Sequence, residues 1–158
     1  MNVLIAYYTM QGRSGKASEE LAKYLSAKGH KTTVEKIAPK PDYSKLKAYT
    51  IGCMQAMRKQ TIELEPPKNN PASFDIIAVI CPTWAATCAP PGYSYISNLP
   101  EARKGQNALA ITINAGTPGN GPKALAGFFE KKGYGVLAAF TLQDPLKIGE
   151  TLAKEAKL

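Results

Sequence analysis

The residues best suited to chemistry form a turn, Thr9 to Ser14, directly after an apolar run near the start of the chain. The run from Val3 to Tyr8 has the composition of a buried strand, and an amphipathic helix pattern follows the turn. A turn with hydroxyl and glycine residues at such a junction aims backbone N–H groups and a helix N-terminus at an anion. The segment therefore predicts a phosphate cradle.

This turn differs from the two common glycine-rich phosphate loops. The P-loop pattern needs glycine where this chain has Met10 and a hydroxyl residue where it has Ala17, which argues against an NTPase. The dinucleotide fingerprint G-x-G-x-x-G does not occur after the strand either. A simpler alternative stays open, in which Thr9 only turns the chain and Ser14 caps a helix from Gly15 to Lys28.

Five apolar runs alternate with helix patterns along the chain, which predicts an α/β fold with a doubly wound, five-stranded parallel sheet and helices on both faces. We expect the second strand at an edge, because it is the most polar. The expected strands are Val3 to Tyr8, Thr32 to Ile37, Asp75 to Cys81, Asn107 to Ile113 and Gly135 to Thr141. The expected helices are Gly15 to Lys28, Tyr43 to Met57, Tyr93 to Asn98, Pro122 to Lys132 and one beginning near Pro145.

Two further loops are expected beside the phosphate cradle, because such sheets bind ligands beyond the carboxyl ends of their strands. The loop from Pro82 to Pro91 holds Trp84, the one tryptophan of the chain, as a candidate stacking plate for a flat ligand. The alternative is that Trp84 packs over the sheet edge as part of the core. In the loop from Asn114 to Gly121, small residues let the backbone approach a flat ligand closely, although it could equally be a simple turn.

Taken together, these three loops resemble the flavodoxin family, and the resemblance runs over nearly the whole chain. The matching segments are Tyr8 to Ser14, Phe74 to Ala85 and Ala115 to Gly119. The resemblance implies one flavodoxin-like domain over residues 1–158, the strand order 2-1-3-4-5 and a noncovalently bound FMN. It assigns Thr9, Gln11, Gly12, Arg13 and Ser14 to the phosphate, and Thr83, Trp84, Ala85, Ala115, Gly116 and Thr117 to the flavin ring.

Four features depart from the family pattern. Gln11 replaces a usual hydroxyl residue, and Ser14 stands where threonine is commoner. Ala86 stands where relatives often have glycine, and its Cβ makes a positive φ costlier. The chain is also basic, with a net charge of +8, whereas flavodoxins are typically acidic.

The charge, the cysteines and the apolar runs of the chain bear on its partners and its location in the cell. Much of the positive charge lies between Lys28 and Lys59, which favours an acidic protein partner over nucleic acid, because no nucleic-acid motif accompanies it. A basic surface that is simply solvated is the commoner alternative. The three cysteines, Cys53, Cys81 and Cys88, fit neither a disulfide framework nor a zinc site, and Cys88 lies in a loop where its thiol could be exposed. Without a signal peptide or an apolar run long enough to span a membrane, the cytoplasm is the expected location.

The leading hypothesis is an FMN-dependent electron carrier or oxidoreductase whose redox partners are proteins, acidic ones by charge; no catalytic side chain is required. The first alternative is a reductase that passes hydride from NAD(P)H to a quinone or similar acceptor, with a homodimer walling the pocket. The second is a binding module that keeps the fold without the cofactor. The sequence leaves a monomer or a homodimer open.

Overall fold

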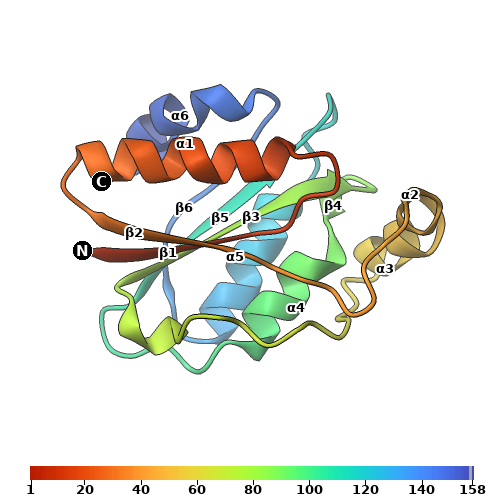
Figure 1. Cartoon of the computed structure of the whole chain (residues 1–158), viewed down its shortest axis with the longest axis horizontal. Helices are drawn as coiled ribbons and strands as arrows, with labels where there is room; N and C mark the ends of the chain where they lie inside the picture. The colour runs from red at the N-terminus through yellow and green to blue at the C-terminus, as the bar shows by residue number, and fades with distance from the viewer. Residues whose placement is uncertain (157) are drawn as a thin grey trace.

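Five parallel strands form the centre of the molecule, which the computed structural model describes for residues 1–156 and 158. They lie in the order β2-β1-β3-β5-β6, and a short sixth strand, β4, runs antiparallel to the end of β3 (Figure 1). The bounds are β1 Asn2–Tyr7, β2 Lys31–Lys36, β3 Ile76–Trp84, β4 Thr87–Cys88, β5 Asn107–Ile113 and β6 Gly135–Leu142.

Helices cover both faces of this sheet. Helices α1 (Arg13–Ala27) and α6 (Ile148–Glu155) lie on one face, and α4 (Pro90–Asn98) and α5 (Gly121–Lys131) lie on the other (Figure 1). A single 3-10 turn, Pro145–Lys147, leads into α6. None of the described helices combines the length and the apolar composition needed to cross a bilayer.

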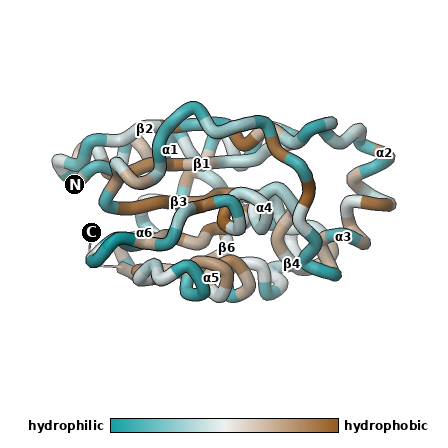
Figure 2. The backbone as a smooth tube through the Cα atoms, turned by 90° about the horizontal axis from the view of Figure 1, so that it is seen from below, coloured by the Kyte–Doolittle hydropathy of each residue, from teal (hydrophilic) through white to brown (hydrophobic). Residues whose placement is uncertain are grey.

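The strand side chains alternate between two apolar cores. Along β1, for example, Leu4 points toward α4 and α5, whereas Val3 and Ile5 point toward α1 and α6, and all three are fully buried. The central strands are covered on both faces and are therefore nearly continuous in apolar residues. Figure 2 shows hydrophobic segments running through the middle of the sheet, with hydrophilic segments mostly outside it.

The predicted order 2-1-3-4-5 is confirmed, because the five predicted strands correspond to β1, β2, β3, β5 and β6. The polar second strand does lie at an edge. Sequence patterns missed β4, a strand of only two residues that a tight turn folds back onto β3. The fold is flavodoxin-like.

The connection between β2 and β3 forms a projection at one end of the sheet. Its helical part comprises α2 (Lys45–Lys47), a π-helical turn (Ala48–Gly52) and α3 (Cys53–Met57), followed later by a 3-10 turn at Pro71–Ser73. We call residues 43–57 the arm. It stands near the β3–β4 end of the sheet (Figure 1), so the expected helix is present, although in three short pieces.

Candidate functional site

A pocket of about 220 Å³ lies where β1, β3 and β5 end, and the arm supplies its fourth wall. This is the edge at which doubly wound sheets bind ligands. The loop after β1 contributes Thr9, Met10, Gln11, Arg13 and Ser14; the arm contributes Ala48, Tyr49 and Cys53; the end of β3 contributes Pro82, Thr83, Trp84 and Ala85; and β5 with its loop contributes Ile113 and Ala115.

The loop after β1 presents an uncapped helix N-terminus to this pocket. Gly12 precedes α1 with a φ of 87°, a left-handed conformation that suits glycine, and the described residues supply no capping side chain. The first turn of α1 contains no acidic residue. Its first backbone N–H groups have no partner within the helix, so this end can bind an anion.

Of the two simpler roles considered for Thr9 and Ser14, the structure confirms one and corrects the other. Thr9 does turn the chain, because its Oγ1 accepts a hydrogen bond from the Gly12 N–H at 2.9 Å. Ser14 does not cap the helix, which corrects the simpler interpretation: α1 begins at Arg13, two residues before the expected start at Gly15, and Gly12 holds the capping position. The buried Ser14 lines the pocket instead.

The end of β3 brings an unpaired polar atom to the pocket. The Thr83 hydroxyl oxygen is buried and finds no hydrogen-bond partner among the described residues. A buried hydroxyl without a partner costs roughly 1–3 kcal/mol, so a ligand with a donor or an acceptor at this point recovers that energy. Among the described residues, His30 and Thr112 also have a buried polar atom without a partner, but only Thr83 lines the pocket, which makes its hydroxyl a candidate contact for a polar part of a ligand.

A strained turn follows directly. Ala85 and Ala86 connect β3 to β4 with φ values of 49° and 58°, both left-handed, as a two-residue hairpin requires. Each costs about 1–2 kcal/mol for a residue with a Cβ. The Ala86 residue thus adopts the positive φ despite its side chain. Its carbonyl accepts a 2.8 Å hydrogen bond from the Asn120 N–H, which ties the turn to the loop after β5.

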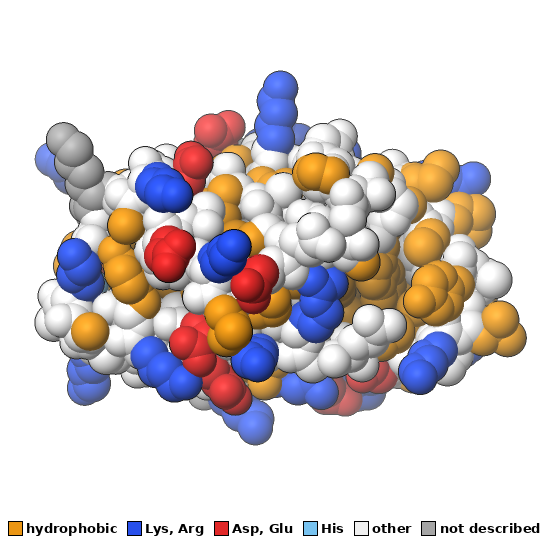
Figure 3. All heavy atoms as spheres, turned by 90° about the horizontal axis from the view of Figure 1, so that it is seen from above, with side chains coloured by type: hydrophobic (Ala, Val, Ile, Leu, Met, Phe, Trp, Pro, Cys, Tyr) orange, Lys and Arg blue, Asp and Glu red, His pale blue; other side chains and the backbone are white. Residues whose placement is uncertain are grey.

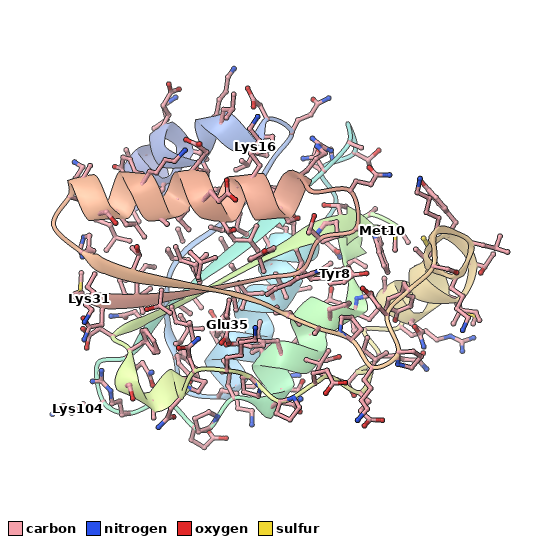
Figure 4. All side chains as sticks on the ribbon, in the orientation of Figure 1. Tyr8, Met10, Lys16, Lys31, Glu35 and Lys104 are labelled. Carbon is pink, nitrogen blue, oxygen red and sulfur yellow. The ribbon has the colours of Figure 1, made fainter. Side chains whose placement is uncertain are left out.

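Trp84 is both a pocket wall and part of the packing. Its ring makes edge-on contacts with Tyr8 (centroids 5.9 Å apart) and Tyr43 (5.2 Å), and it lies against Gly52 of the arm. Trp84 therefore does pack as part of the core, the alternative that the sequence left open, and these contacts hold its ring in place. Figure 4 shows Tyr8 and Met10 toward the end of the sheet at which the arm stands.

Hydrogen bonds fasten the arm to this cluster. The Tyr43 hydroxyl donates to Gln55 Oε1 at 2.5 Å, and Asp42 Oδ1 accepts from the Tyr8 hydroxyl at 3.2 Å and from the Tyr43 N–H at 2.7 Å. Burial, together with the nearby Asp42 carboxylate, raises the pKa of Tyr43 to about 12. The same two causes raise the pKa of Tyr8 further still.

Arg13 is the one charged side chain among the described residues that line the pocket. Its guanidinium donates to the Gln143 carbonyl in the loop after β6, so it is held at the rim. The described residues contain no group of side chains arranged to hold a metal ion. The electrostatic balance of the pocket is therefore positive, from Arg13 and from the N-terminus of α1.

The structure brings most of the sequence-predicted residues together. Thr9, Gln11, Arg13, Ser14, Thr83, Trp84, Ala85 and Ala115 line the pocket, whereas Gly12, Gly116 and Thr117 do not. The lining residues that sequence analysis missed are Met10, Ala48, Tyr49, Cys53, Pro82 and Ile113. Met10, Pro82 and Ile113 adjoin predicted residues, but no motif marks the arm, whose one signal is a helix pattern between two strands.

The expectation that Cys88 is exposed is wrong. Its side chain is fully buried beside Cys81, and both sulfur atoms lie against Gly92 in α4. Burial raises the pKa of the Cys88 thiol well above its usual range. The unpredicted β4 explains this difference, because it folds the loop inward.

Comparison with known proteins agrees on the fold. No family model matches the sequence, and no curated protein matches it significantly. A candidate flavoprotein from Bacteroides eggerthii is similar in structure over 99% of both chains, with 18% identity and a TM-score of 0.74. A Lactobacillus acidophilus flavoprotein in complex with FMN shares 18% identity over 94% of this chain and 97% of its own (TM-score 0.66). Two-electron reduced Megasphaera elsdenii flavodoxin shares 16% sequence identity over 96% of this chain and 98% of its own, with a TM-score of 0.61.

Proposed function

We propose that this flavodoxin-fold chain binds one FMN noncovalently in the pocket and carries electrons between other proteins. One observation supports this most directly: an uncapped helix N-terminus and the unpaired hydroxyl of Thr83 meet in a single pocket at the ligand-binding edge of the sheet. The first suits a phosphate, and the second suits a polar edge of a flat ring. The similar protein from Lactobacillus acidophilus was solved with FMN.

Different lining residues of the pocket suit the phosphate and the ring of this cofactor. The phosphate would lie at the α1 N-terminus, with Ser14 and Arg13 beside it, and the isoalloxazine ring against Trp84, Ala85 and Ala115. The pocket, at about 220 Å³, is below the roughly 300–1,000 Å³ of sites that enclose a whole drug-sized ligand. Part of the cofactor would therefore face solvent, where a partner protein can exchange electrons with it.

Flavin supplies the redox chemistry, and the chain sets its environment. Arg13 and the α1 N-terminus place positive charge at the site, and no acidic residue lines the described pocket. A positive environment favours the anionic reduced form of a flavin. We therefore expect a less negative reduction potential than acidic flavodoxins have. A potentiometric titration that gives a potential as low as theirs would contradict this step.

The test is a visible spectrum of the protein after incubation with FMN and gel filtration, run in parallel with riboflavin, which lacks the phosphate. We expect one retained FMN per chain and riboflavin binding at least tenfold weaker, because the helix N-terminus has no anion to bind. Equal affinities would refute the phosphate assignment, and no retained flavin would refute the function.

A matched variant separates the ring contact from the phosphate contact. Thr83→Val keeps the shape of the side chain and removes its hydroxyl, so it should weaken FMN and riboflavin by the same factor. Steady NADH or NADPH oxidation by the FMN-loaded protein with a quinone as acceptor would argue for a reductase instead of a carrier.

A further inference from the structure

The arm carries an unusual concentration of exposed apolar side chains. Leu46, Tyr49, Ile51, Met54 and Met57 are 75%, 71%, 47%, 44% and 67% exposed. Figure 3 shows hydrophobic side chains gathered at the end of the molecule where the arm lies. Water contact with so many large apolar groups on 12 consecutive residues is unfavourable, and such patches on soluble proteins mark interaction surfaces.

The charges around these side chains are nearly all positive. Lys45, Lys47, Arg58 and Lys59 are exposed, and none forms an ion pair with any residue that the structure describes. The nearby carboxylate of Asp42 already accepts hydrogen bonds from Tyr8 and Tyr43. An apolar centre within a basic rim is therefore available to a partner of opposite charge.

This surface and the pocket share a residue. Tyr49 lines the pocket, yet most of its side chain is exposed among the apolar residues of the arm. It lies in the π-helical turn Ala48–Gly52, a rare conformation that often occurs at functional positions. A partner that covers the arm surface therefore also approaches the mouth of the pocket.

We propose that the arm surface, Leu46, Tyr49, Ile51, Met54 and Met57 with its Lys45, Lys47, Arg58 and Lys59 rim, docks an acidic electron-transfer protein. This inference rests on the proposed function, because it places the partner where a flavin in the pocket would exchange electrons. The charges favour an acidic protein over a second copy of this chain, which would set the same cations against each other. The charges alone would suit an anionic membrane equally well, but Tyr49 belongs to both the arm surface and the pocket, and a bilayer that covered the pocket mouth could not exchange electrons with a flavin there.

The experiment measures binding of a defined probe, an acidic plant-type [2Fe–2S] ferredoxin, to immobilised protein with and without FMN. Basic cytochrome c serves as the probe of opposite charge. In the variant Lys45→Glu/Lys47→Glu we expect the ferredoxin association rate constant at low salt to fall at least tenfold. The control Lys31→Glu/Lys104→Glu makes the same change in net charge at the far end of the molecule (Figure 4). It should lower the ferredoxin association rate constant less than twofold.

The apolar centre has its own variant. Leu46→Ser/Met57→Ser changes two side chains that are mostly exposed, so the fold should persist, as circular dichroism would verify. Ferredoxin should dissociate at least fivefold faster from this variant, while the salt dependence of binding stays the same, because no charge changes.

Three results would overturn the proposal: no ferredoxin binding by the unaltered protein, equal losses in the two lysine variants, or preferential binding of cytochrome c. Dimerisation through the arm in gel filtration, or tight binding to phosphatidylglycerol vesicles, would assign the surface to a different occupant and equally reject it. Flavin content is measured separately. Ferredoxin binding by a protein that retains no FMN would therefore refute the proposed function and leave the docking surface standing.

Discussion

Gly119 offers the sharpest test of how the pocket is held together. It lies in the loop after β5 with a φ of 64°, directly against the hairpin turn between β3 and β4. A Cβ added at this position would lie 2.8 Å from the Ala86 Cα and closer still to the Ala86 carbonyl group. These are backbone atoms, so no side chain can rotate away. Gly119→Ala must therefore separate the two loops.

The cost has two parts. An alanine with a positive φ costs about 1–2 kcal/mol, less a few tenths for the lower entropy of its unfolded chain. Separating the loops breaks the Asn120 N–H to Ala86 carbonyl hydrogen bond, and the overpacking adds about 1–3 kcal/mol. The total is about 2–5 kcal/mol, or a fall in Tm of roughly 4–20 °C for a domain of this size.

The matched control is Gly105→Ala. Gly105 has a φ of 80° and open space around its Cβ position, so this change carries the backbone cost alone. Urea unfolding of both variants should show Gly119→Ala to be at least 1 kcal/mol less stable than Gly105→Ala. FMN affinity should fall about tenfold in Gly119→Ala only, because Ala85 and Ala86 are displaced at the pocket. Equal unfolding free energies for the two variants would refute the close loop contact.

Three further outcomes are expected. Trp84→Ala weakens FMN binding by about 1–2 kcal/mol through lost stacking, and an unchanged Kd in flavin titrations would remove Trp84 from the site. In the native protein, Ellman's reagent should modify Cys53 and spare the buried Cys81 and Cys88, and bound FMN should slow the reaction, since Cys53 lines the pocket; a second fast thiol would contradict this burial. The folded state raises the pKa of Tyr43 from 10.0 to about 12, so it favours the protonated phenol. The resulting contribution to stability is fully present below pH 10 and is lost as the pH rises to about 12. Tyr43→Phe should therefore flatten the fall of Tm with pH in this range, and an unchanged profile would contradict it.

The sheet was predictable because its signal is strong and local. Apolar runs such as Asp75 to Cys81 can be buried on both faces only as central parallel strands, and the polar second strand is suited only to an edge. The rule that ligands bind at the carboxyl ends of such strands then selected the loops that carry Thr9, Thr83 and Ala115. This part of the site follows from strand order.

The fourth wall could not be predicted in the same way. Tyr49 and Cys53 reach the pocket because the arm folds back and packs Gly52 against Trp84, a contact between residues more than thirty positions apart. The turn at Ala85 and Ala86 is equally hidden, since two alanines are poor candidates for left-handed backbone. Tertiary contacts, which a single sequence does not display, decided both features.

These contacts make the β3–β4 hairpin the joint of the whole site. On one side Trp84 packs against Gly52 of the arm, and on the other the Ala86 carbonyl is bound by Asn120 beside Gly119. Each contact depends on a glycine where a Cβ would collide with the hairpin, at 2.8 Å from the Trp84 ring for Gly52. The arm and the loop after β5 do not need to touch each other to be coupled, because both contact the hairpin residues 84–87. A partner that shifts the arm would therefore move Trp84 and change the wall of the pocket, and the strained turn behind Trp84 gives that wall little freedom to move independently.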